Sequence, residues 1–170
     1  MKRILMGLAV LAAFAAAGGR ADANDSWITT KAKLTLLTTD GIHVSAPNVD
    51  TVDGKVTLHG KVDSVDEKNK AAKVVEKIDG VKSVNNLLQV VAPSDKKRVD
   101  AKDSDIKDRV EASLKANASF KDVNVSSVNN GVVLLSGKTV TIADELRAVE
   151  AAHEVAGVRR VSSEIEAPEK

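Results

Sequence analysis

An internal repeat constrains the fold of this chain more than any other feature. The segment GKVTLHGKV, residues 54–62, lines up with GVVLLSGKT, residues 131–139, at a separation of 77 residues. Further matches at separations of 77 or 78 are GVKSVNN with GVRRVSS, Asp25-Ser26 with Asp103-Ser104, and Leu36 with Leu114. Most of the chain is therefore two copies of one unit of about 65 to 70 residues.

Each copy begins with a predicted helix. In the first copy Ile28, Ala32 and Leu36 are apolar residues at the four-residue spacing of one helix face. Asp25 and Ser26 precede this series and offer side-chain oxygens, so we expect them to cap the helix.

A hairpin, a second helix and a last strand follow. Asp53-Gly54 and Asn129-Asn130-Gly131 suit a tight turn, because these residue types tolerate positive φ. In the first copy we expect strands over 48–52 and around 56–62, a helix over 65–79 and a strand over 83–91. The second copy repeats the first strand over 124–128, the helix over 143–156 and the last strand over 160–167. The predicted fold class is α+β, each αββαβ unit having a three-stranded sheet with two helices on one face.

This pattern resembles the BON domain, in the element order, in the hairpin DGKVTLHGKV and in the helix that ends in DGVKSVNN. The resemblance implies two BON domains with mixed sheets, at 24–92 and 103–170, joined by a polar linker over 93–102. It also implies a non-enzymatic periplasmic protein of envelope or osmotic stress, with phospholipid association or chaperone activity toward unfolded envelope proteins. Bridging of envelope components through the open sheet faces is the alternative.

The first 23 residues have the order of a secretory signal peptide. Lys2 and Arg3 are followed by an apolar run over 4–17 and by an Ala-Asp-Ala site, so we expect cleavage after Ala23. An apolar run of this length is shorter than the roughly 20 residues of a membrane span. We therefore expect export to the periplasm.

Composition argues against several functions. The chain has no cysteine, which excludes thiol catalysis and cysteine-based metal sites. The net charge falls from +1 to −1 when Lys2, Arg3, Arg20 and Asp22 leave with the signal peptide. With one Trp, no Tyr and this charge, we expect no nucleic-acid binding.

GVVLLSGKT ends like a phosphate-binding loop, but its spacing is wrong. Such a loop has four residues between its first glycine and Gly-Lys-[Ser/Thr], whereas here five mostly apolar residues intervene, Val132 to Ser136. We predict a strand instead, with Gly131 in the turn, Gly137 at a bend or bulge, and no nucleotide bound.

The histidines give no sign of a metal or catalytic site. His43, His59 and His153 fall in a loop, on the polar side of a strand and on a helix, and none has a second His or Cys at ligand spacing. We expect ordinary surface histidines, no catalytic residues, no metal and no cofactor.

Differences between the copies indicate candidate binding residues. Trp27 and Leu34 share a helix face away from the Ile28 side, and Lys31 lies beside them. The group can anchor at an anionic phospholipid surface. The alternative, which we expect more often of a large apolar side chain, is that Trp27 packs on the sheet edge or the other domain.

The second helix of the first copy adds a basic side, Lys70, Lys73 and Lys77, where the second copy has Arg147, Glu150 and Glu154. Such a side can hold anionic lipid headgroups, although it is more often a solvated face. Any lipid site is therefore expected in the first copy.

The open sheet face also differs. The first copy has Lys55 and Thr57 on the face turned away from the helices, and the second copy has Val132 and Leu134 there. Two apolar residues on an open face predict a covering surface, either the sister domain or a partner protein.

Overall fold

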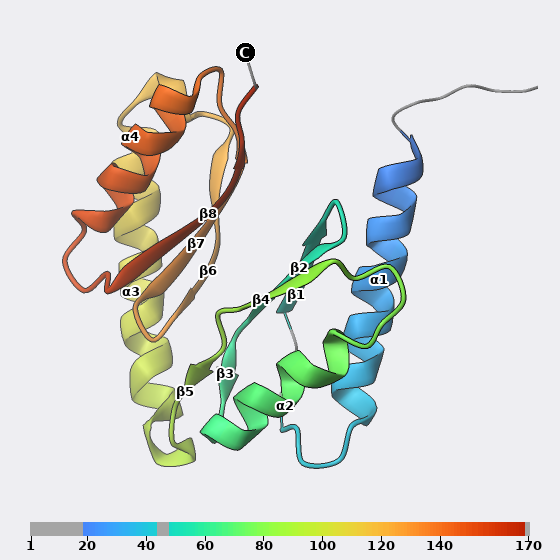
Figure 1. The fold of residues 1–170 in the computed structure, drawn as a ribbon. Helices are drawn as coiled ribbons and strands as arrows, with labels where there is room; N and C mark the ends of the chain where they lie inside the picture. The colour runs from blue at the N-terminus through green and yellow to red at the C-terminus, as the bar shows by residue number, and fades with distance from the viewer. Residues whose placement is uncertain (1–18, 44–47, 169–170) are drawn as a thin grey trace, which may run out of the picture.

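The computed structural model describes residues 19–43 and 48–168 (Figure 1). Most of the predicted signal peptide, residues 1–18, lies outside the described residues. The predicted cleavage position after Ala23 falls within the first helix, α1 (Gly19–Thr38). None of the helices in the described ranges combines the length and hydrophobicity of a membrane span.

The chain folds into two αββαβ units. The first contains α1, β1 (Asn48–Val52), β2 (Lys55–His59), β3 (Lys61–Val62), α2 (Val65–Val75), β4 (Ser83–Asn86) and β5 (Gln89–Val90). The second follows a short 3₁₀ turn, η1 (Pro93–Asp95), and contains α3 (Lys96–Lys115), a second 3₁₀ turn η2 (Ala118–Phe120), β6 (Val123–Asn129), β7 (Val132–Lys138), α4 (Ile142–His153) and β8 (Arg160–Glu166).

Both sheets have the same mixed topology, which confirms the predicted α+β fold. The strand orders are β1-β2-β4 and β6-β7-β8, with an antiparallel hairpin followed by a parallel last strand. In the first unit Gly60 interrupts the middle strand, so that β3 and β5 continue the sheet as a separate parallel pair.

Each unit has its own core between the sheet and its two helices. In the first, Ile28 and Leu36 of α1 pack with Val56 and Leu58 of β2 and with Val75 of α2. In the second, the matching core includes Ile106 and Val110 of α3, Val133 and Leu135 of β7, and Ala148 of α4. The helices cover one face of each sheet and leave the other face without helices.

Asp25 and Asp103 do not cap their helices, because both lie inside them. The side chain of Asp25 instead reaches the hairpin turn, where its oxygens accept the backbone N–H groups of Asp53 at 2.7 Å and Gly54 at 2.9 Å. Asp103 accepts those of Asn130 and Gly131 at the same two distances. The repeated aspartate is therefore a tertiary latch that fixes helix to hairpin.

The segment 93–102, the predicted polar linker, is helical. Pro93 opens η1, and α3 runs without a break from Lys96 into the second unit. Proline favours a helix start, Val99 is buried, and the ammonium of Lys96 lies 2.6 Å from the carboxylate of Asp63. Buried and paired side chains hold this polar segment as two turns of helix.

Candidate functional site

The outer side of α1 carries an exposed apolar stripe. Trp27 is 58% exposed, and Leu34 and Leu37 are each 60% exposed, on the side of α1 away from the buried Ile28. The ammonium of Lys31 lies 5.1 Å from the centre of the Trp27 ring, a cation–π contact. The structure thus places Trp27 mostly in solvent, contrary to the expectation that it packs against protein.

Leu37 was missed from the sequence. It follows Leu34 by three residues and therefore shares its helix face, a spacing that the sequence already contained. The second unit has no such stripe, because Asp105, Ala112 and Lys115 occupy the positions of Trp27, Leu34 and Leu37.

The predicted basic residues lie in the same helical layer. Lys70 and Lys73 are exposed on α2, and Lys77 is exposed in the turn that follows it. The ammonium of Lys70 also donates a hydrogen bond to the carbonyl of Asp40. Because α1 and α2 cover the same sheet face (Figure 1), their solvent sides both point away from the sheet, and the lysines belong to the same outer layer as the stripe.

The open faces of the two sheets turn toward each other, and the helices of each unit lie on the outside (Figure 1). Leu134 is only 1% exposed and Val132 is buried, although neither belongs to a helix-covered core. In the first unit Thr57, His59 and Leu87 are buried on the opposing open face. We call the region where the two open faces meet the seam; Val132 and Leu134 are buried on the open face of the second unit.

One half of the seam is closed by Lys61, which pairs with the buried Asp103 and the exposed Asp100. The Lys61 ammonium lies 2.7 Å from a carboxylate oxygen of Asp100 and 2.7 Å from one of Asp103. Burial disfavours the charged form of Lys61, but hydrogen bonds to the two carboxylates outweigh it and the pKa of Lys61 is raised. The repeat counterpart of Lys61 is Lys138, which pairs instead with Glu166 of its own sheet.

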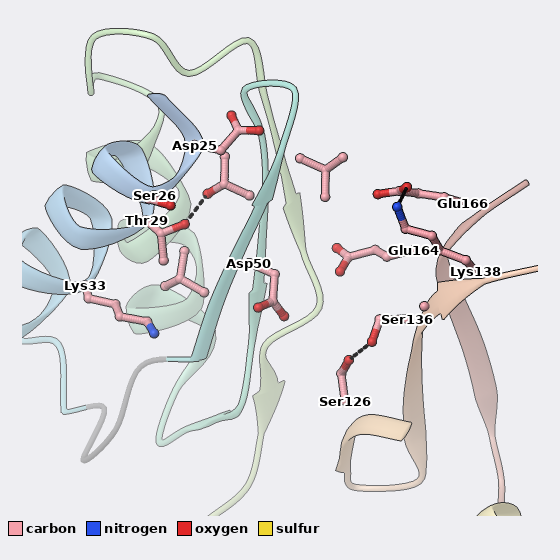
Figure 2. Close-up of a pocket in the computed structure, with 14 residues that line it drawn as sticks. Asp25, Ser26, Thr29, Lys33, Asp50, Ser126, Ser136, Lys138, Glu164 and Glu166 are labelled. Atoms are coloured by element: carbon pink, nitrogen blue, oxygen red, sulfur yellow. Dashed lines mark hydrogen bonds and ion pairs between the residues drawn. The ribbon is translucent and has the colours of Figure 1, made fainter. Parts of the chain in front are cut away.

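The other half of the seam is polar and contains a cleft of about 610 Å³. Figure 2 shows Asp25, Ser26 and Asp50 on one wall and Ser126, Ser136 and Glu164 on the other. Burial raises the pKa of Glu164, and the nearby carboxylate of Asp50 acts in the same direction. Hydrogen bonding to the Nε2 of His59, at 2.8 Å, lowers the pKa of Asp50 despite its burial.

The sequence profile of the BON domain matches this chain twice, over residues 24–92 and 102–168. The chain belongs to the BON-domain family. Osmotically-inducible protein Y of Escherichia coli (strain K12) is 32% identical over 152 residues, which cover 84% of this chain and 72% of the relative.

Two solved structures of CdsD, a structural protein of the type III secretion system of Chlamydia trachomatis, are also similar. The first, its C-terminal domain, is 14% identical with a TM-score of 0.34; the match covers 81% of this chain and 63% of that one, somewhat less than two thirds. The second is 15% identical with a TM-score of 0.35, over 82% of this chain and 91% of the other.

His59 of the first BON domain is not a surface residue. It is 5% exposed at the seam, where strand alternation places it correctly on the face away from the helices but the second BON domain covers that face. His43 and His153 are exposed, as expected.

His43, Asp63 and Glu67 lie close enough together to ligate a cation, but their oxygens already have structural partners. Glu67 accepts the backbone N–H groups of His43 and Asp63, and the hydroxyl of Ser64, the N-cap of α2, accepts the backbone N–H of Glu67. The Asp63 carboxylate pairs with Lys96. The cluster therefore stabilises the N-terminus of α2 in the first BON domain.

The segment that resembles a phosphate loop is a turn and a strand of the second BON domain. Gly131 stands in the turn with φ of 75°, and β7 begins at the next residue. Gly137 has φ of 121°, and a side chain there would collide with the carbonyl of Asp122. The bulge itself lies on the partner strand, between Val125 and Ser127.

Proposed function

We propose that this protein is a non-enzymatic periplasmic protein of the envelope or osmotic stress response that associates peripherally with anionic phospholipid surfaces. The observation that carries the proposal is the exposed stripe of Trp27, Leu34 and Leu37 with Lys31 over the tryptophan ring. Similarity to Osmotically-inducible protein Y supports the osmotic setting, and the signal-like N-terminus supports the compartment.

The chemistry of the stripe suits the boundary between lipid and water. Tryptophan is enriched at that boundary, because its ring is apolar with one polar edge. Each lysine close to an anionic surface contributes about 1 kcal/mol, so Lys31 and the lysines of α2 add an attraction that salt weakens. The stripe is short and lies on one helix face, so it can enter the membrane interface without crossing the bilayer. This predicts reversible binding of the intact fold.

Vesicle co-sedimentation tests this proposal. We expect binding to vesicles with anionic lipid, weak binding to neutral ones, and a loss of binding as salt rises. Leu34→Glu should weaken binding about tenfold or more, since it removes an apolar contact of about 1.5–3 kcal/mol. Ala112→Glu, at the same position of the second domain, is the matched control and should bind like the native protein. Absence of binding to either vesicle type would end the proposal.

Chaperone activity toward unfolded envelope proteins is the second candidate. Val140, Ile142 and Leu146 of the second domain are each more than half exposed around the start of α4, where the first domain has Asp63, Val65 and Asn69. Apolar groups at a helix end offer contacts for apolar segments of a client.

An aggregation assay separates this candidate from lipid binding. We expect sub-stoichiometric protein to suppress aggregation of an unfolded outer-membrane protein, and Leu146→Lys to weaken the suppression while leaving vesicle binding intact. Asn69→Lys is the control at the matching position of the first domain. A chain that suppresses no aggregation even in excess is not a chaperone for that client.

Bridging through open sheet faces is the least supported alternative. It needs accessible faces, whereas Thr57 and Leu134, which lie on those faces, are only 4% and 1% exposed. We propose no cofactor, nucleotide or nucleic acid as a ligand.

A further inference from the structure

We propose that the polar half of the seam is a proton-sensitive closure: ionisation of Glu164 drives the two BON domains apart on that side, and protonation draws them together. The inference concerns the domain pair itself and does not depend on lipid or client binding.

Glu164 is placed between the domains. It projects from β8 onto the open face, where it shares one pocket with Asp50 and a second pocket with Thr57 and Lys55 of the first domain. The charges of Asp50 and His59 also act on its carboxylate. On its own sheet its strand neighbour across β7 is Ser136, and Lys138 and Glu166 lie at the next position on that face, paired at 3.0 Å. Lys33 of α1 also lines the cleft.

Burial and the neighbouring Asp50 carboxylate favour a proton on Glu164. His59 Nε2 is already paired with Asp50, and Lys138 with Glu166. An ionised Glu164 therefore adds a second carboxylate beside Asp50, and the neutral hydroxyl of Thr57 lies in the same pocket as Glu164. Burial is the largest influence on Glu164, and it penalises the charged form.

The sign of the effect follows from linkage. The pKa of Glu164 is raised in the closed arrangement, first by burial and then by Asp50, and separation of the domains would return it toward its ordinary value. The closed form therefore binds the proton more tightly, and closure weakens as pH rises through the raised pKa.

The two halves of the seam differ in what holds them, and this gives the motion a direction. Repeat symmetry matches Glu164 with Leu87 and Thr57 with Leu134, so the polar pair in one half corresponds to two buried leucines in the other. The leucine half also holds the Lys61 ion pair. Opening therefore begins at the cleft, with the leucine half as the pivot.

The width of the cleft is directly measurable, because the chain has no native cysteine. Ser26→Cys and Ser126→Cys place spin labels on opposite walls of the cleft (Figure 2). Over a titration from about pH 4 to about pH 9, we expect the distance distribution to shift to longer values as pH rises through the raised pKa of Glu164. The measurement is made on the full chain without vesicles.

Matched variants identify the group. Glu164→Gln mimics the protonated form and should keep the short distance at every pH, while Glu166→Gln, on the same strand face, should retain the native transition. Thr57→Val removes the hydroxyl that lowers the pKa of Glu164, so the midpoint should move to higher pH. Circular dichroism at each pH checks that the variants are folded.

Two results would overturn the proposal. One is an unchanged distance in the native sequence across this pH range. The other is a Glu164→Gln protein that opens with pH as the native one does, which would assign the transition to other groups, such as the His59–Asp50 pair.

Discussion

The Lys61 ammonium of the first BON domain lies 2.7 Å from the same Asp103 carboxylate that holds the hairpin turn of the second. One carboxylate thus receives two backbone N–H groups and a cation from the other domain. The latch of the second domain and the contact between domains therefore share one carboxylate. Among the described residues, the equivalent Asp25 accepts hydrogen bonds from its own hairpin turn alone.

Removal of the latches should have unequal effects. Asp25→Ala leaves two turn N–H groups without their charged acceptor and should lower the free energy of unfolding by about 2 kcal/mol. Asp103→Ala should cost more, because it also leaves the mostly buried Lys61 short of a partner. Urea unfolding of both variants measures the difference, and equal losses would show that Lys61 adds nothing to the latch.

Lys61→Met should loosen the closed half of the seam. The pKa of Lys61 is raised from 10.5, so its ionic contribution is fully present at neutral pH and disappears as pH rises through the raised value. The stability gap between native and variant proteins should therefore shrink in alkali. Lys138→Met, which removes the exposed counterpart, should leave stability nearly unchanged in the same titration.

Gly137→Ala should be far more damaging than Gly60→Ala, although the two glycines occupy equivalent positions. A Cβ at Gly137 meets the Asp122 carbonyl, whereas at Gly60 the nearest atom is a Leu88 methyl at 3.7 Å. Both substitutions strain a positive φ at about 1–3 kcal/mol. Only Gly137→Ala also displaces backbone, and thermal unfolding should show a loss beyond that range.

Leu134→Lys should destabilise the chain by about 3–5 kcal/mol or separate the domains, because it buries an unpaired charge at the seam. Val140→Lys is the control, since Val140 is 78% exposed and its change should stay within about 0.5 kcal/mol. Calorimetry with small-angle scattering distinguishes unfolding from separation. A Leu134→Lys protein that matches the native one in both would mean that the seam does not form in solution.

The repeat made most of each domain predictable. Hairpin turns, the apolar face of α1 and the glycine after each second helix are local patterns, and local patterns specify αββαβ units. The roles of Asp25 and Asp103 escaped prediction, because an aspartate near a helix start has the same local pattern whether it caps or reaches a distant turn.

For the candidate sites, too, local patterns predicted which face a side chain lies on, but not what covers that face. The Trp27 and Leu34 face follows from helical periodicity, but its exposure depends on what the rest of the chain covers. Val132 and Leu134 indicated a covering surface without identifying it, and His59 was assigned to solvent, because alternation along a strand gives a face and not the neighbour of that face.

The α3 helix begins in the segment between the domains and runs without a break into the second domain, and its first residue, Lys96, pairs with Asp63 of the first domain. A chain shortened to begin at residue 103 would lack Lys96, Val99 and the first turns that brace the latch helix. A cut that separates the two domains should therefore be made before Pro93. Any motion of one domain relative to the other must come from the few residues between β5 and η1.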